Sequence, residues 1–207
     1  MTNKFEAHLG ARKAAIVEAV LRLADRVGVT GITTKRIAQE VGFVEAALYR
    51  HIKTKLDVFR MILDVSTMFI DLKFQDIADR KLDPETALRD WFDFAVDYLE
   101  EYPGIYRILF SDALYVEDRG LFLQFKAITM GLRDRFEKII RKGMRGGDFR
   151  RDLDPKAWAT LYLGVIHTSF PLWRVFNERS TRFRATAAAL FENYMMGLVR
   201  PARESSR

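Results

Sequence analysis

The feature that most limits how this chain can fold is a pair of short helical patterns joined by a tight turn, in residues 33–51. The stretch reads TTKRIAQE, then VGF, then VEAALYRH. Gly42 supplies the backbone freedom that such a turn requires. The residues expected to hold the second helix against the first are Ile37, Ala38, Val41, Ala47 and Leu48. This spacing is that of a helix-turn-helix, in which the second helix enters the major groove.

The rest of the chain also predicts helices, because the 3.6-residue apolar period recurs while alternation never persists. We expect an all-α fold of about nine helices. A three-helix head in residues 1–55 precedes a larger helical body in residues 56–207. The expected helices are a first one ended by Gly28, then 34–41, 44–51, 55–78, one opened by Asp83-Pro84, 105–113, 119–142, 154–177 and 181–199, with GMRGGDFRRD as a loop.

Charge and aromatic residues are unevenly divided along the chain. Residues 1–55 hold ten Lys/Arg against five Asp/Glu, whereas the other 152 residues hold 24 against 23. Only three of the 26 aromatic residues precede residue 56. The head is therefore suited to a polyanion, and the body to burying or holding something apolar.

Several functional classes lack their usual residues. The chain has no cysteine, and its three histidines, His8, His51 and His167, share no metal-ligand spacing, so we expect no metal and no cofactor. No apolar run is long enough for a membrane span, and MTNKFEAHLGARK lacks the apolar core of a secretory signal. We expect a cytoplasmic protein without a membrane partner.

Two helix starts carry basic residues where acidic ones are normal. Thr33 is placed to cap a helix whose first turn is Thr34, Lys35 and Arg36, and Lys53 and Lys55 flank Thr54 at the next long helix. A helix N-terminus carries partial positive charge, so each misplaced cation costs about 0.3 to 1 kcal/mol. Phosphates bound at both ends would compensate for this cost.

Residues 12–63 resemble the DNA-binding head of the TetR family of bacterial transcriptional regulators. The segment GITTKRIAQEVGFVEAALYRHIKTKLDVFRMIL matches its pattern at Thr34, Ile37, Ala38, Gly42, Leu48, Tyr49, His51, Lys55 and Leu56. The resemblance implies a homodimer, joined through the last two helices of each subunit, that represses transcription from a palindromic operator in double-stranded DNA until a small effector enters the body. The residues it assigns to DNA contact are Thr33, Thr34, Lys35, Arg36, Val44, Glu45, Ala46, Ala47, Tyr49, His51, Lys53 and Lys55.

The start of the recognition helix departs from the family pattern, which often has Ser and then a basic or polar residue. Val44 and its alanine neighbours are suited to apolar contact with thymine methyl groups. Glu45 could accept a hydrogen bond from a cytosine amino group, or could merely satisfy its own helix N-terminus.

The body predicts an apolar effector pocket and a dimer surface. The expected pocket residues are Trp91, Phe94, Tyr98, Tyr106, Phe110, Phe122, Phe125, His167, Phe170 and Trp173. His167 has an alternative as a buried neutral imidazole. The expected dimer residues are Trp158, Leu161, Tyr162, Val165, Leu172, Leu190, Phe191 and Tyr194.

The leading hypothesis is a repressor released from its operator by a small apolar or aromatic effector. The alternatives are an all-α enzyme acting on an apolar substrate, and a helical adaptor that binds a protein partner. The chain has no Cys nucleophile, no Ser-His-Asp order and one His in the body, so we expect no enzyme.

Overall fold

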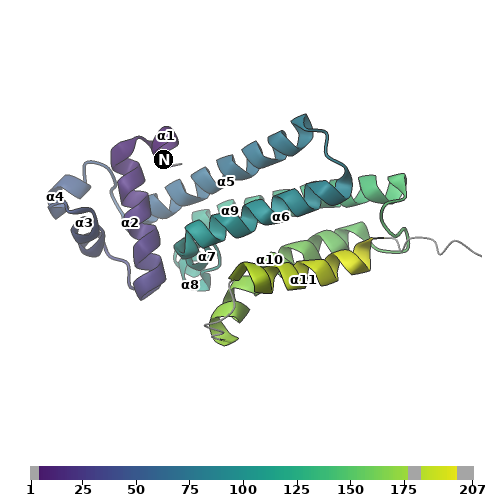
Figure 1. The fold of residues 1–207 in the computed structure, drawn as a ribbon. Helices are drawn as coiled ribbons and strands as arrows, with labels where there is room; N and C mark the ends of the chain where they lie inside the picture. Colours follow the sequence, from purple (N-terminus) through teal and green to yellow (C-terminus); the bar gives the residue numbers. More distant parts are fainter. Residues whose placement is uncertain (1–4, 177–182, 200–207) are drawn as a thin grey trace, which may run out of the picture. The chain divides into compact units, whose positions relative to one another are not determined.

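The computed structural model describes residues 5–176 and 183–199, which form eleven α-helices without a strand, apart from one isolated bridge between Phe149 and Val199 (Figure 1). The all-α prediction is confirmed, and the two additional helices are the short α1 and α8. The helices are α1 (Glu6–Leu9), α2 (Ala11–Val27), α3 (Thr34–Val41), α4 (Glu45–Leu48), α5 (Lys55–Asp79), α6 (Pro84–Glu101), α7 (Pro103–Leu109), α8 (Asp112–Glu117), α9 (Arg119–Gly146), α10 (Pro155–Phe176) and α11 (Phe183–Leu198).

The chain forms two compact units. The first comprises Met1–Leu72 with Tyr98–Ile128, and the second comprises Lys73–Asp97 with Thr129–Arg207. Three helices, α5, α6 and α9, therefore contribute one part to each unit. The first unit contains the head predicted for residues 1–55, and within it α7 packs on α2.

A glycine makes that packing possible in the first unit. A Cβ atom added at Gly104 would lie 1.9 Å from the carbonyl oxygen of Leu21, so the backbones of α7 and α2 meet without an intervening side chain. Apolar residues of α2, α3 and α4 close the core beside them, and Ile16, Ile37 and Leu48 are fully buried. The helix-turn-helix is thus held on a helix that is itself fixed to α7.

The turn between α3 and α4 has the predicted glycine conformation, but α4 is shorter than expected. Gly42 has φ +78° and ψ +30°, and its N–H closes α3 on the carbonyls of Ala38 and Gln39. The α-helix then covers only Glu45–Leu48 rather than residues 44–51. The N–H groups of Arg50 and His51 bond three residues back, which tightens the end of the helix.

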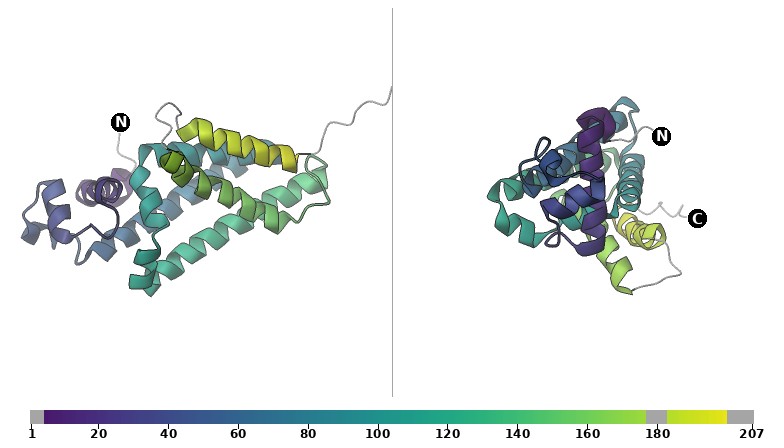
Figure 2. Two further views of the ribbon diagram at one scale, coloured as in Figure 1. Left: turned by 90° about the horizontal axis from the view of Figure 1, so that it is seen from below. Right: turned by 90° about the vertical axis from the view of Figure 1, so that its left-hand side faces the viewer.

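The second unit has an aromatic core. Trp91 and Phe136 meet edge to face at 4.8 Å, and Phe136 lies 4.3 Å from Tyr162. Phe92 and Phe191 stack at 4.2 Å. α10, which contains Pro171, runs beside α11 in every view (Figures 1 and 2). These rings join α6, α9, α10 and α11 around one core.

α9 continues through a segment predicted as a loop. It ends at Gly146, although GMRGGDFRRD was expected to be irregular from residue 143 onward. A Cβ atom at Gly143 would lie 2.3 Å from the ring of Phe149, which has no exposed surface. Gly143 therefore makes room for this ring rather than ending the helix.

Candidate nucleic-acid interface

The N-terminal end of α4 presents an exposed, largely apolar surface. Val44 precedes the helix and is 75% exposed, and Tyr49 at its other end is 49% exposed. Glu45 and Ala46 are exposed and Ala47 is half-buried. Val44 does not cap α4 through its side chain. The predicted base-contacting residues are therefore accessible together at one end of the helix-turn-helix.

Glu45 accepts hydrogen bonds from both hydroxyl groups that the resemblance assigns to phosphate. Its Oε1 lies 2.9 Å from Thr34 Oγ1 and 3.4 Å from the hydroxyl of Tyr49. The two hydroxyls are 3.3 Å apart. Thr34, Glu45 and Tyr49 thus form a closed hydrogen-bond triad across α3 and α4. In the protein alone, the carboxylate occupies donors that a DNA phosphate would need.

The start of α3 has the basic character expected from the sequence. Thr33 accepts from the N–H of Arg36, and no acidic residue lies in the first turn. The guanidinium of Arg36 donates to the carbonyl of Gly31 at 2.5 Å. Lys35 is exposed and forms no ion pair with another residue of the described ranges. Lys35 is therefore the cation available at this helix end.

The start of α5 differs from the prediction, because an acid already caps it. Asp57 Oδ2 accepts from the N–H groups of Lys53 and Thr54, each at 2.8 Å. Burial alone would raise the pKa of Asp57, but these backbone hydrogen bonds bring it below its ordinary value. The Thr54-x-x-Asp57 spacing is that of a capping box, which was the overlooked signal.

The two lysines at this helix start have different surroundings. Lys55 Nζ lies 3.4 Å from a carboxylate oxygen of Glu117 on α8. Lys53 is exposed and has no ion pair among the described residues. Only Lys53 is available without breaking a contact. His51 is half-buried, with its ring 6.1 Å from that of Phe43.

A brace that the sequence analysis missed joins α2 to α3. Arg22 and Arg26 donate to the two oxygens of Glu40 at 3.0 and 2.5 Å. Hydrogen bonds from Arg26 and then Arg22 lower the pKa of Glu40. The spacing of the two arginines, one helical turn apart, was the available signal. The brace fixes the orientation of α3 on α2.

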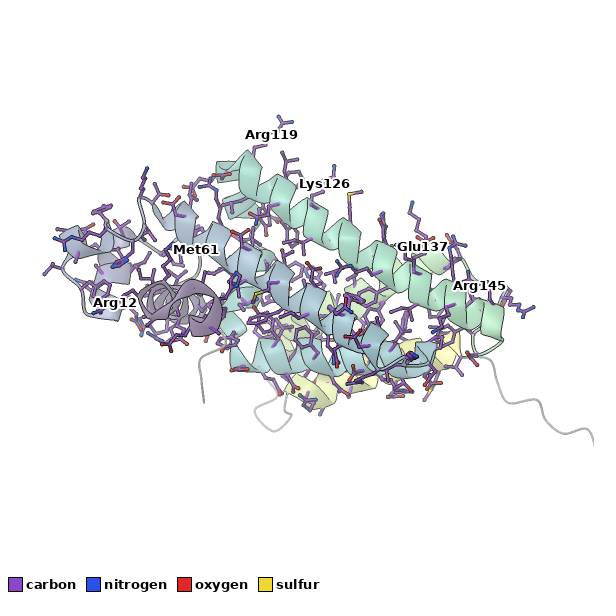
Figure 3. All side chains as sticks on the ribbon, turned by 90° about the horizontal axis from the view of Figure 1, so that it is seen from above. Arg12, Met61, Arg119, Lys126, Glu137 and Arg145 are labelled. Carbon is purple, nitrogen blue, oxygen red and sulfur yellow. The ribbon has the colours of Figure 1, made fainter. Side chains whose placement is uncertain are left out.

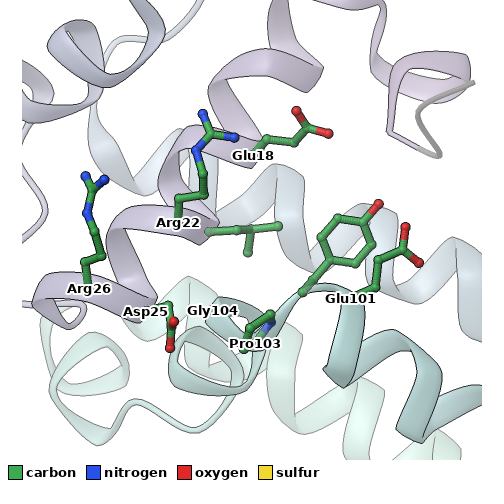
Figure 4. Close-up of a pocket in the computed structure, with 9 residues that line it drawn as sticks. Glu18, Arg22, Asp25, Arg26, Glu101, Pro103 and Gly104 are labelled. Carbon is green, nitrogen blue, oxygen red and sulfur yellow. The ribbon is translucent and has the colours of Figure 1, made fainter. Parts of the chain in front are cut away.

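The same face of α2 borders a groove of about 440 Å³ in the first unit. Figure 4 shows Arg22, Asp25 and Arg26 on one wall, with Pro103 and Gly104 on the other. Its lining is strongly charged and mixed in sign: Glu18, Leu21, Arg22, Asp25, Arg26, Glu101, Tyr102, Pro103 and Gly104. It contains none of the residues predicted for the effector pocket.

The predicted pocket residues are packed or exposed within their own units. In the first unit, Phe110 contacts Tyr106 and Phe125 at ring distances of 4.7 and 5.7 Å, and Phe122 is 44% exposed. Ser66 lies 3.4 Å from the hydroxyl of Tyr98, whose pKa burial raises. None of these residues lines the groove beside α2.

In the second unit, Trp91 and Phe170 are buried and Phe94 is half-buried. His167 is exposed in the single chain, so it is not buried in the core of its own unit. The side chain of Trp173 lies outside the described part of the chain.

The residues predicted for the dimer surface divide into two groups. Tyr162, Phe191 and Tyr194 are buried in the second unit, where the hydroxyl of Tyr162 donates to the carbonyl of Leu88 at 2.7 Å. Leu161 and Leu172 are 54% and 36% exposed. The half-buried members are Trp158, Val165 and Leu190. The apolar surface of α10 that a second subunit could contact therefore centres on Leu161.

Two further classes of site are absent from the described residues. Within residues 5–176 and 183–199, no three His, Cys, Asp or Glu side chains form a cluster that could hold a metal ion. None of the helices in those ranges is long and apolar enough to cross a membrane.

Similarity to known proteins was found in both sequence and structure. No family profile matches the chain. The nucleoid occlusion factor SlmA of Marinobacter nauticus is 28% identical over 148 residues, covering 72% of this chain and 74% of SlmA. The ketosteroid transcriptional regulator KstR2 of Mycobacterium tuberculosis superposes with a TM-score of 0.76 at 17% identity, covering 92% and 96% of the two chains.

A third protein carries the family name. The TetR-family protein CprB of S. coelicolor A3(2) has a TM-score of 0.68 at 20% identity, and the match covers 92% of this chain and 91% of CprB. The likeness extends over both the helix-turn-helix and the body. The chain therefore has the fold of the TetR-family transcriptional regulators, which confirms the resemblance seen in residues 12–63.

Proposed function

We propose that the protein is a DNA-binding transcriptional regulator that binds a palindromic operator as a homodimer. The observation that carries this proposal is the exposed end of α4 on a TetR-type fold, flanked by Lys35 and Lys53, which form no ion pair with any residue that the structure describes. A two-fold dimer places two recognition helices about 34 Å, or a multiple of it, apart. The operator should therefore consist of two inverted half-sites.

Phosphate contacts position the head, and the end of α4 reads bases. Lys35 and Lys53 neutralise backbone phosphates on either side of the recognition helix. Val44 and Ala46 contact thymine methyl groups, because they are exposed and apolar. An apolar effector bound in the body favours a conformer that no longer fits the operator. A coupling of about 1 to 3 kcal/mol would give roughly 5- to 150-fold induction.

Selection from a random pool of duplex DNA tests the proposal. The full chain should enrich an inverted repeat, whereas an enzyme or a protein-binding adaptor should enrich nothing. The double variant Lys35→Ala/Lys53→Ala should weaken binding to all sequences and lower the slope of log affinity against log salt by about 2. Lys126→Ala, an exposed lysine on α9, is the matched control. An unchanged slope in the double variant would exclude the phosphate assignment.

A second candidate function follows from the sequence relatives, which are named nucleoid occlusion factors. On this alternative the same head binds sites dispersed over the chromosome rather than a few promoters. Mapping bound sites in the source cell by chromatin immunoprecipitation distinguishes the two. A few promoter sites favour the ligand-responsive regulator, and many dispersed sites favour a chromosome-wide role.

A further inference from the structure

A groove of about 490 Å³ lies in the second unit, between the end of α5, the start of α6 and the C-terminal part of α9. We call it the basic groove. Figure 3 labels Glu137 and Arg145 on this part of α9. The groove is lined by Phe74, Ile77, Ala78, Lys81, Leu82, Pro84, Ala87, Arg135, Lys138, Ile139 and Lys142. Its size is that of a small-molecule site.

The floor of the basic groove is apolar. Phe74 is half-buried and its ring packs 5.5 Å from that of Phe136, while Ile77 is 7% exposed. The turn that closes α5 forms one end of the groove. Lys81 adopts a left-handed conformation with φ +52°, and Leu82 donates its N–H to the carbonyl of Ile77 at 3.4 Å. A lysine seldom occupies this conformation.

The rim of the basic groove is cationic, with no acid among the lining residues. Its four cations are Lys81, Arg135, Lys138 and Lys142. None of the three lysines forms an ion pair with a residue of the described ranges. Arg135 lies over the ring of Phe74, 4.9 Å from its centroid. A polar boundary of one sign thus surrounds an apolar floor.

Several carboxylates on the neighbouring turns are held by bases outside the groove, whereas Asp79 and Asp83 accept hydrogen bonds from the neutral Gln75 and Thr86. Asp90 contacts Lys73 and Arg80 at 2.6 and 3.1 Å, and the same two bases contact Asp76. Glu137 pairs with Arg141 at 2.7 Å. Asp134 pairs with Arg133 at 3.0 Å in the same way. The positive charge available to a ligand therefore lies on the three rim lysines, which have no ion pair among the described residues.

We propose that the basic groove binds a single-chain amphipathic carboxylate, with its hydrocarbon chain on Phe74, Ile77 and Ile139 and its carboxylate among the rim lysines. The concave apolar floor requires a hydrocarbon, and the one-signed rim requires an anion. A second copy of this chain would need about 800 Å² of contact per partner, far more than so small a groove provides. The site supplies a ligand class for the regulator proposed above, but its test does not depend on DNA binding.

Isothermal titration calorimetry of the full chain with dodecanoate, below the concentration at which it forms micelles, tests this site. We expect one molecule per chain, and binding about tenfold or more weaker for dodecyltrimethylammonium, which has the same tail and the opposite charge. Lys138→Glu/Lys142→Glu should weaken dodecanoate binding about tenfold or more. Lys126→Glu, an exposed lysine on the same helix outside the groove, should leave it unchanged.

A second variant tests the hydrocarbon part. Ala78 is exposed at the edge of the groove, so Ala78→Phe fills the groove without disturbing the core and should abolish binding. Equal binding of the cationic amphiphile, or unaltered dodecanoate binding in either groove variant, would overturn the proposal. Because calorimetry is done without DNA and operator selection without dodecanoate, failure of one leaves the other intact.

Discussion

Replacing Glu45 with glutamine removes one negative charge from the recognition surface and keeps the side chain's size. The structure predicts tighter binding to DNA of any sequence. In the protein alone, the carboxylate of Glu45 holds the hydroxyls of Thr34 and Tyr49, at 2.9 and 3.4 Å. A phosphate that takes these two donors must displace the carboxylate and then lie close to it.

Two costs set the size of the effect. A hydrogen bond to a charged acceptor contributes about 1 kcal/mol more than one to a neutral acceptor. Two unit charges about 4 Å apart repel by about 1 kcal/mol in water. All three side chains are accessible to solvent, so we take the lower end of the sum, about 1 to 2 kcal/mol. Non-specific affinity should therefore rise roughly 5- to 30-fold.

Fluorescence anisotropy of a labelled duplex of random sequence at about 0.15 M salt measures this change. Glu6→Gln is the control, because Glu6 is an exposed acid of the same unit outside the triad and its loss changes net charge equally. Glu45→Ala, tested by selection, should also relax sequence preference if this residue reads cytosine. Equal effects of Glu45→Gln and Glu6→Gln would refute the reasoning, since only overall charge would then matter.

Three further predictions concern the brace, the α2–α7 contact and the dimer. The pKa of Glu40 is lowered in the folded chain, so the ionised side chain contributes stability at neutral pH that is lost as the pH falls below about 4.3. Glu40→Gln should therefore lower Tm at pH 7 and have no effect at a pH where wild-type Glu40 is protonated. A difference in Tm that is independent of pH would contradict this. Gly104→Ala places a methyl group against the carbonyl of Leu21 and should lower the free energy of unfolding, measured in urea, by about 1 to 3 kcal/mol. The control Gly131→Ala has open space around its Cβ position and should raise that free energy by about 0.5 to 1 kcal/mol. Similar values for the two variants would exclude the close contact. If the chain forms the homodimer proposed above, Leu161→Glu should give a monomer in light scattering with the helical circular dichroism retained, and an unchanged dimer would place the interface elsewhere.

Local patterns in the sequence predicted the helix-turn-helix well. Gly42 and the apolar spacing around it act within a few residues, so the backbone at the turn follows directly from them. The start of α6 was predicted for the same reason, since Asp83 accepts from the N–H of Thr86 as a helix cap. Features that depend on one or two turns of chain can be derived from the sequence.

Features that depend on distant segments could not be derived in this way. An aromatic residue at helical spacing can face a pocket, a partner or its own core, and Tyr162 illustrates the ambiguity. It was predicted to lie on a dimer surface, yet it is fully buried against residues far away in the chain. The hydrogen bonds of the triad could not be predicted from the sequence either, because the role of Glu45 depends on Thr34, which lies on the preceding helix. Its residue type alone suggested only a helix cap or a base contact.

The ion pair between Lys55 and Glu117 has a consequence for what a phosphate contact at Lys55 would contribute. A phosphate that takes Lys55 would release a counterion from DNA, but it would also break an existing ion pair with Glu117, which is half-exposed. The gain from the new contact would be offset by the lost one, so Lys55 would add less to affinity than a lysine without a partner. Glu117→Gln would remove this competition and should strengthen DNA binding if Lys55 meets phosphate.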